Sequence, residues 1–291
     1  MKASGFQYHR PRDKGEALDM LGSLPNAKVI AGGQSLVAML NMRYAFVDHL
    51  VDVNRVDGLA GIEVGNGRVR IGAMARQRDM LAHRELAARA PLIPAAMRFI
   101  GHLHTRNRGT FGGSLVHMDP AAELLAIATI LDAEIEIESR KGVRVVPIAD
   151  FPLSYMTPNL EPDELVVAIT LNPPLPKHGW AFDEFAQRHG DFAVVSVGVT
   201  TVLGAAGRIE EVRLVLGGMG FAPTRLRQAE DLMSGETPSP ELFDEAAEVA
   251  GREEASSDAI ASASYRCRLA KVLMRRSLAV AIERGREQAV K

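Results

Sequence analysis

The stretch at residues 105–123 reads TRNRGTFGGSLVHMDPAAE and contains three glycines, at positions 109, 112 and 113. Its glycine pair, Gly112–Gly113, lies between the hydroxyls of Thr110 and Ser114. A glycine pair permits positive φ and lets an anion approach the backbone N–H groups closely. The stretch therefore predicts a loop that can surround a phosphate group with backbone donors.

A second loop of the same composition lies upstream. Residues 31–36 read AGGQSL and follow the apolar pair Val29–Ile30, which is typical of a strand. Both loops contain a glycine pair and end in Ser-Leu, so together they predict two backbone cradles around one pyrophosphate. Glycine pairs also mark ordinary tight turns, and the residues alone leave both interpretations open.

Composition excludes several classes of protein. The 291 residues, 47% of them apolar, suffice for one large domain or two ordinary ones. A net charge of −2 argues against nucleic acid as a partner. The single cysteine, Cys267, excludes an internal disulfide and an iron–sulfur cluster held by this chain's own thiolates. The longest apolar stretch, residues 121–133, is shorter than the roughly 20 residues of a membrane span, so we expect a cytoplasmic protein.

Apolar periodicity predicts helices and strands in the first part of the chain. The expected helices are one capped by Asp13 with Ala17, Leu18 and Leu21 on its apolar face, and others over residues 36–42, 76–89, 92–101 and 119–131. The expected strands are residues 28–30, 49–53, 62–64, 69–71, 134–138, 143–146 and 165–171, with two hairpins among them.

A cluster of prolines at 173, 174 and 176 predicts a domain boundary, with domains over residues 1–175 and 176–291. After this cluster, strands are expected at residues 181–188, 193–203 and 209–217. Helices are expected at residues 225–233, 240–252 and 262–284. Strands followed by helices indicate an α+β domain.

The chain resembles the FAD-binding medium subunit of the molybdenum hydroxylases, the family of xanthine dehydrogenase and aerobic carbon monoxide dehydrogenase. The resemblance rests on residues 28–36 (KVIAGGQSL), residues 106–115 (RNRGTFGGSL) and residues 119–123 (DPAAE). Residues 185–193 and 264–276 fit the same pattern.

The resemblance implies an α+β fold in two domains. Residues 1–175 would form a FAD-binding domain of the PCMH type, with FAD between two α/β subdomains. Residues 176–291 would form the C-terminal domain of the carbon monoxide dehydrogenase flavoprotein type, a three-stranded antiparallel sheet with helices.

The resemblance also implies which residues contact FAD. The backbone N–H groups of residues 31–35 and 110–114, with the hydroxyls of Ser35 and Thr110, would hold the diphosphate, and such bonds contribute about 1.5–3 kcal/mol each. Residues 28–30 would line the adenosine. The whole implied set is Lys28, Val29, Ile30, Ala31, Gly32, Gly33, Gln34, Ser35, Leu36, Ile100, Gly101, Gly109, Thr110, Gly112, Gly113, Ser114, His117, Glu123, Leu165, Val166, Asp191 and Phe192.

Several of these positions have more specific implied roles. Leu165 and Val166 would pack on the flavin ring or the adenine, and residues 191–192 would lie near the isoalloxazine ring. Glu123 stands where relatives often have an aspartate that bonds the ribityl chain. His117 matches a position that faces the flavin, and Ser114 replaces a common asparagine.

One charge change is implied beside the ring. Glu184 stands where some relatives have a lysine, which would alter the charge near the flavin and its potential.

Other motifs predict no further site. A metal site built on His102, His104 and His117 is not expected, because zinc needs three or four ligands of suitable geometry and no cysteine contributes. Residues 217–220 (GGMG) resemble half a nucleotide fingerprint but lack its strand–helix context. Neither a Ser-His-Asp group nor a pair of carboxylates stands out, so we assign no catalytic residue.

The resemblance implies an oxidoreductase subunit. FAD would receive electrons from 2Fe-2S clusters on a small partner subunit and deliver them to an external acceptor. Hydroxylation would take place at a molybdopterin cofactor on a large subunit, in a dimer of heterotrimers. Two alternatives remain open: a stand-alone flavin-dependent oxidoreductase of the same fold, and a flavin-free assembly module.

Overall fold

The computed structural model describes residues 2–174 and 177–290, and the chain divides into two compact units. Unit 1 consists of Met1–His83, His102–Met118 and Ala133–Leu171. Unit 2 consists of Arg84–Gly101, Asp119–Asp132 and Asn172–Lys291. Two short segments of the first half of the chain therefore pack with the C-terminal part.

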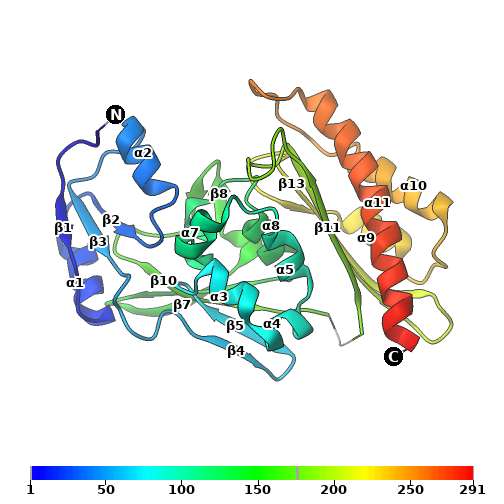
Figure 1. Ribbon diagram of the computed structural model, residues 1–291, viewed down its shortest axis with the longest axis horizontal. Coiled ribbons are helices and arrows are strands. Elements are labelled where there is room, and N and C mark those ends of the chain that lie inside the picture. Colours follow the sequence, from blue (N-terminus) through cyan, green and yellow to red (C-terminus); the bar gives the residue numbers. More distant parts are fainter. Residues whose placement is uncertain (1, 175–176, 291) are drawn as a thin grey trace. The chain divides into compact units, whose positions relative to one another are not determined.

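A three-stranded parallel sheet in unit 1 leads into the loop at residues 31–36 (Figure 1). Its strand order is β1 (Gln7–His9), β3 (His49–Asp52) and β2 (Ala27–Ile30). Helix α1 (Lys14–Ser23) packs Ala17, Leu18 and Leu21 into the core, and Asp13 caps it by accepting a hydrogen bond from the Glu16 N–H. Helix α2 (Leu36–Met42) follows the loop. The predicted cap and the bounds of α2 are confirmed.

The second sheet of unit 1 is antiparallel. Its order is β4 (Ile62–Gly65), β5 (Arg68–Gly72), β10 (Leu165–Leu171), β6 (Glu134–Ser139) and β7 (Gly142–Pro147). Both predicted hairpins and the bounds of β10 are confirmed. In the first hairpin Asn66 and Gly67 have φ of 50° and 76°, the left-handed values that a tight two-residue turn requires. The smaller elements of unit 1 are α3 (Gln77–Ala82), α6 (Leu103–Arg108), α7 (Phe111–His117), η1 (Ile148–Asp150), β8 (Pro152–Ser154) and β9 (Thr157–Pro158).

The glycine-rich stretch that we expected to be a loop is largely helical. Gly112, Gly113 and Ser114 lie in the first turns of α7, and Thr110 is its N-cap, accepting a 3.1 Å hydrogen bond from the Gly113 N–H. The next helix, α8 (Glu123–Ile130), begins after Asp119–Pro120 rather than at them, with Ala122 as its N-cap. Local capping by Thr110 explains why a glycine pair is stable in α7.

Unit 2 is built on a four-stranded antiparallel sheet, whereas we predicted three strands. The order is β11 (Gly179–Phe185), β12 (Val195–Leu203), β13 (Ile209–Gly217) and β14 (Thr224–Arg225). The additional strand, β14, pairs Arg225 with Val215 and Thr224 with Leu216. A strand of two residues has no periodicity, so the sequence pattern did not reveal it.

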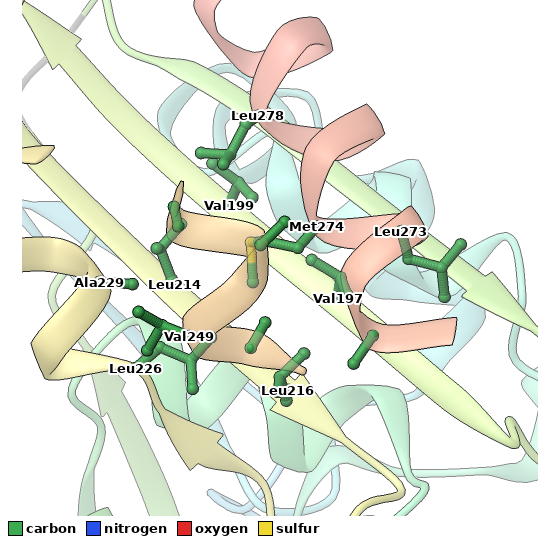
Figure 2. Close-up of a cluster of buried hydrophobic side chains, with 14 of the residues drawn as sticks. Val197, Val199, Leu214, Leu216, Leu226, Ala229, Val249, Leu273, Met274 and Leu278 are labelled. Carbon is green, nitrogen blue, oxygen red and sulfur yellow. The ribbon is translucent and has the colours of Figure 1, made fainter. Parts of the chain in front are cut away.

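Three helices cover one face of this sheet. They are α9 (Arg227–Met233), α10 (Pro240–Ala250) and α11 (Ala263–Val290). Figure 2 shows the buried cluster that they form with the sheet, including Val197 and Leu214 from the strands and Met274 from α11. No helix within the described residues combines the length and apolar composition needed to cross a bilayer.

The opposite face of the sheet packs against α5 (Leu92–Met97) and α8, with α4 (Arg84–Arg89) preceding them. A Cβ on Gly198 of β12 would lie 2.8 Å from Cγ1 of Val215 on the neighbouring strand. It would be in ordinary van der Waals contact with Cδ1 of Ile130 at 3.5 Å, which shows that α8 lies directly over this strand. The single helix predicted over residues 76–89 is two helices, α3 and α4, separated at His83.

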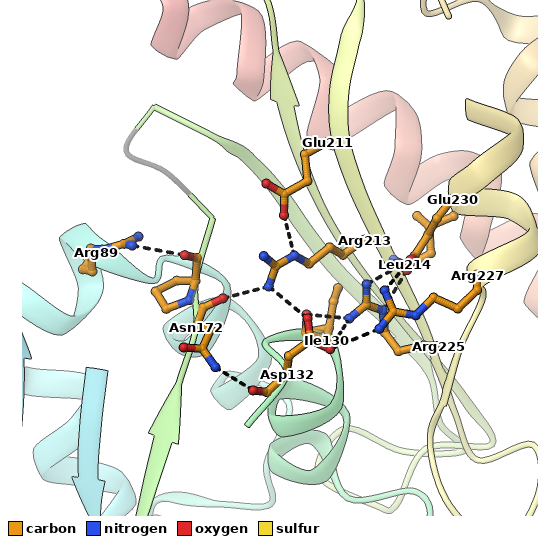
Figure 3. Close-up of polar contacts among 11 residues, drawn as sticks. Arg89, Ile130, Asp132, Asn172, Glu211, Arg213, Leu214, Arg225, Arg227 and Glu230 are labelled. Carbon is orange, nitrogen blue, oxygen red and sulfur yellow. Dashed lines mark hydrogen bonds and ion pairs between the residues drawn. The ribbon is translucent and has the colours of Figure 1, made fainter. Parts of the chain in front are cut away.

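A polar cluster at the end of α8 joins this helix to the sheet (Figure 3). The Asp132 carboxylate lies 2.8 Å from the Arg225 guanidinium and 3.4 Å from that of Arg213. Glu230 lies 2.7 Å from Arg225, and the two side chains are only 7% and 9% exposed. Arg225 is thus bound both to Glu230 of α9 and to Asp132, and the cluster links the end of α8 to the sheet.

Candidate cofactor-binding site

The loop after β2, residues 31–36, which we call the first glycine loop, presents unpaired backbone donors. Within residues 2–174 and 177–290, no protein group accepts a hydrogen bond from the N–H groups of residues 32–35. Gly33 has a φ of +74°, which bends the loop. Successive free N–H groups in such a bend form an anion-binding concavity.

Residues 108–114, the second glycine loop, contribute different groups. The Gly112 N–H donates to the Ala73 carbonyl over 2.9 Å, and the Ser114 N–H donates to the Thr110 carbonyl over 3.2 Å. The Gly113 N–H is bound to the Thr110 hydroxyl oxygen. These N–H groups are therefore used in hydrogen bonds within the protein. The groups of the second loop that can still donate to an anion are the hydroxyls of Thr110 and Ser114.

The glycines allow the two loops to lie against each other in unit 1. A Cβ on Gly32 would lie 2.3 Å from the carbonyl oxygen of Arg108, at the start of the second loop. A Cβ on Gly112 would lie 2.6 Å from Cβ of Ala73. Glycine is required at both positions because the obstructing atoms belong to backbone or to a Cβ, which cannot move independently.

Two side chains that the sequence analysis missed connect the loops. The Asn54 amide donates to the Ala31 carbonyl over 2.8 Å. The Arg76 guanidinium donates both to the Asn54 side-chain oxygen and to the Arg108 carbonyl. Arg76 therefore bonds directly to the second loop and, through Asn54, to the first.

Asp52 holds Asn54 in place. Its carboxylate accepts hydrogen bonds from the Tyr8 hydroxyl and from the Asn54 N–H, the latter over 2.9 Å. Burial raises the pKa of Asp52, but these hydrogen bonds outweigh burial and hold the pKa below its ordinary value. The carboxylate is thus charged at neutral pH and orients Asn54 permanently.

The residues implied by resemblance are divided between the two units. Unit 1 contains the residues of both loops, residues 28–30, His117 and residues 165–166. Leu165 is buried with α1 and β3 in the core of this unit. Unit 2 contains the other implied residues, which are Ile100, Gly101, Glu123, Asp191 and Phe192.

Those five residues differ in burial. Glu123 is 5% exposed at the start of α8, and Phe192 is 57% exposed. Burial raises the pKa of Glu123 to about 7, so this carboxyl is largely protonated below neutral pH.

Comparison with known families settles the membership of the chain. Residues 4–174 match the family described as the FAD binding domain in molybdopterin dehydrogenase. The chain belongs to the FAD-binding medium subunits of the molybdenum hydroxylase family. Residues 180–281 match the carbon monoxide dehydrogenase flavoprotein C-terminal domain. The chain is therefore part of an oxidoreductase.

Relatives match this medium subunit over almost its whole length. It is 37% identical to the nicotine 6-hydroxylase medium subunit of Paenarthrobacter nicotinovorans, covering 96% of this chain and 98% of the relative. It is 35% identical to the 6-hydroxypseudooxynicotine dehydrogenase complex subunit alpha of the same organism, covering 98% and 97%. A chain of carbon monoxide dehydrogenase from Hydrogenophaga pseudoflava superposes with a TM-score of 0.94 at 32% identity, covering 98% and 99% of the two chains.

The first glycine loop fits the diphosphate of FAD. A diphosphate needs several hydrogen-bond donors at close range, and residues 32–35 supply backbone N–H groups that no other described group uses. The Thr110 hydroxyl remains able to donate its proton, because its oxygen only accepts from Gly113.

Arg76→Met is expected to weaken FAD binding about 10–100-fold, because it removes the charge-assisted bonds that join the two loops, each worth about 1.5–3 kcal/mol. The measurement is the dissociation constant of FAD from flavin fluorescence during titration of the flavin-depleted protein. Arg78→Met is the matched control, since Arg78 is exposed and pairs with its neighbour Asp79. Equal affinities of the two variants would contradict this positioning role.

Proposed function

We propose that this medium subunit passes electrons from 2Fe-2S clusters of a partner subunit, by way of its FAD, to an external acceptor. The observation that supports this most directly is the row of unpaired N–H groups at residues 32–35, beside the Thr110 hydroxyl, in a chain of this family. FAD, when bound, supplies the redox chemistry. The residues of this chain bind the flavin, orient it and set its electrostatic surroundings.

We assign the binding roles as follows. The first glycine loop holds the diphosphate through its backbone, and the hydroxyls of Thr110 and Ser114 complete that contact. Residues 28–30 line the adenosine, and Glu123 bonds the ribityl chain. The remaining implied positions, Ile100, Gly101, His117, Leu165, Val166, Asp191 and Phe192, are proposed flavin neighbours.

The proposed partners are a large molybdopterin-binding subunit and a small 2Fe-2S subunit, assembled as a dimer of heterotrimers in the cytoplasm. Relatives described as medium subunits or medium chains support the three-subunit composition. We further propose functional domains over residues 1–175 and 176–291, a division close to the two family matches at 4–174 and 180–281.

The visible spectrum of the protein purified with its natural partners tests this function. We expect flavin absorbance, FAD released on denaturation, the additional absorbance of iron–sulfur clusters, and two further polypeptides. A flavin-containing single chain that never co-purifies with other subunits would contradict the electron-transfer proposal and favour a stand-alone flavoenzyme. A colourless chain that cannot be reconstituted with FAD would contradict the whole proposal.

A further inference from the structure

Three residues form a row across the sheet of unit 2, on the face that packs against α8. Glu184 of β11 lies directly opposite Ser196 of β12, and Ser196 lies directly opposite Gly217 of β13. Directly opposed residues of antiparallel strands point to the same face. Phe182 and Gly198 form the neighbouring pair on this face, where Gly198 lies close to Ile130 of α8.

The beginning of α8 lies over this row. A Cβ on Gly217 would lie 3.5 Å from the Pro120 carbonyl oxygen and 3.8 Å from Cβ of Ala126. Glu123 is three residues before Ala126, so it shares the helix face that meets the sheet. The same Cβ would lie 2.4 Å from Oγ of Ser196, so the absence of a side chain at Gly217 leaves room for the Ser196 hydroxyl under the start of α8.

Polar atoms of this row are buried without a partner. The Ser196 hydroxyl, in a residue only 1% exposed, and Oε2 of Glu184 have no hydrogen-bond partner among the described residues. Glu123 is 5% exposed, and the N–H of its own backbone is the group that bonds its carboxyl. Buried polar atoms of this kind require a proton or a bound molecule to satisfy them.

The charges that act on the two carboxyls are negative. The negative charge of Asp119, just before α8, contributes to the raised pKa of Glu123. The negative charges of Glu123 and Asp183 contribute to the raised pKa of Glu184. Burial, the largest cause, raises the pKa of Glu123 to about 7 and that of Glu184 to about 8. Helix α5 and strand β12, which also pack here, contain no ionisable residue.

The cations on neighbouring elements are engaged elsewhere. The positive charge of Arg276 of α11 lowers the pKa of Asp183. Asp183 precedes Glu184 in β11, so its side chain points to the other face of the strand. Arg266 of α11 donates to the carbonyls of Val194 and Gly218 and pairs with Asp258. Arg213 of β13 pairs with Asp132 and Glu211.

We propose that Glu123 and Glu184 hold one proton between them near neutral pH, in an interior site beside the unpaired Ser196 hydroxyl. A single proton suits this site because it leaves one negative charge in the buried region instead of two, and no cation in the part of the chain that the structure describes is paired with either carboxyl there. A divalent cation is a poorer occupant, since calcium requires about 6–8 oxygen ligands and no group of three potential metal ligands is found among the described residues. The two residues are 61 positions apart in the sequence and only the fold brings their elements together, so no carboxylate pair is evident from the sequence.

If FAD binds as proposed above, the protonation of this site also affects the flavin. Glu123 is the residue that we assign to the ribityl chain, so the protonation state of the pair would change the charge beside the cofactor. The holding of the proton itself depends only on unit 2 and can be measured without FAD.

Infrared spectra of the full-length chain, recorded against pH in flavin-loaded and flavin-depleted form, test the proposal. In the wild-type protein we expect the C=O band of a protonated carboxyl to disappear with a midpoint at about pH 7–8, because the pKa values of Glu123 and Glu184 are raised to about 7 and about 8. In E123Q, the band of Glu184 should shift to lower pH by about one unit or more, because the like charge of Glu123 is removed. In E184Q, the titration step of Glu184 should be absent and Glu123 should titrate near its wild-type midpoint, because Glu184 is still protonated where Glu123 ionises. Circular dichroism verifies folding, and E245Q, at an exposed position of α10, should leave the midpoint unchanged.

The outcomes separate this inference from the proposed function. If E123Q leaves the midpoint of Glu184 unchanged, the two carboxyls titrate independently and the shared proton is excluded. A wild-type spectrum without a protonated carboxyl at neutral pH would also overturn it. S196A should change the frequency of the band, whereas an unchanged frequency would remove Ser196 from the site. Loss of FAD binding with the band intact would contradict only the flavin assignment.

Discussion

Gly32→Ala is expected to abolish stable retention of FAD while preserving the secondary structure of the chain. The added Cβ would lie 2.3 Å from the carbonyl oxygen of Arg108 and 2.9 Å from its carbonyl carbon, and both atoms belong to the backbone. The two glycine loops must therefore separate, which moves the free N–H groups of residues 32–35 away from the diphosphate. Losing two such bonds costs about 3–6 kcal/mol, so the dissociation constant should rise at least about 100-fold.

The measurement is the ratio of FAD to protein after purification, together with the dissociation constant from titration of the flavin-depleted chain. Gly22→Ala is the matched control in the same unit, because nothing lies within 4 Å of a Cβ at Gly22, which lies in α1. The control should bind FAD normally and gain about 0.5–1 kcal/mol of stability from its better helix propensity. A Gly32→Ala protein with wild-type affinity would show that the loops need not touch to bind FAD.

Elements with a regular apolar pattern were predictable from the sequence. The bounds of α2, β10 and β13 agree with the prediction, and the cap of α1 was identified from Asp13. These elements bury one consistent face, so their periodicity reflects their final environment. The predicted fold class followed from them, with the family resemblance supplying the arrangement of the domains.

The predictions that were wrong concern short or locally capped elements. The glycine pair of α7 is typical of a turn, because glycine is a poor helix former. The N-cap that stabilises α7 depends on the geometry of Thr110, which the sequence does not show. Strand β14 has only two residues, and it is a strand because these residues pair with β13 at the edge of the sheet. Pairing of this kind is a tertiary interaction that a local pattern cannot contain.

The candidate site was predictable only in part for the same reason. The glycine loops are contiguous motifs and were found directly. Asn54 and Arg76 follow unrelated segments, and their role depends on hydrogen bonds to Ala31 and Arg108 that the fold creates. A polar residue shortly after a buried strand was the one available signal, and by itself it does not specify a partner.

The stability of the flavin-depleted chain is expected to fall as the pH rises from about 5 to about 8. Burial raises the pKa of Glu123 to about 7 and of Glu184 to about 8, from an ordinary 4.5, so the folded chain keeps protons that the unfolded chain has released. The folded state therefore binds more protons in this window, and each retained proton lowers the free energy of unfolding by about 1.4 kcal/mol per pH unit. Above about pH 8 this contribution is constant.

E184Q should have nearly the stability of the wild-type chain at pH 5, where a neutral carboxyl and an amide are similar. At pH 8 it should be more stable by about 2–4 kcal/mol, because the amide has no proton to lose. The measurement is the free energy of unfolding from urea titrations at intervals between pH 5 and pH 8, with E245Q expected to parallel the wild type.

Carboxyls with lowered pKa do not interfere with this comparison. Hydrogen bonds from Arg144 hold the pKa of Glu164 below its ordinary value, so its stabilising contribution is present above about pH 4.5 and is lost only in more acidic solution. The loss of this contribution therefore lies below the window between pH 5 and pH 8. If the free energy of unfolding of E184Q and of the wild type changes with pH in parallel, Glu184 is ionised in the folded chain. If the two proteins differ only when FAD is bound, the proton is held because of the flavin and not because of the fold.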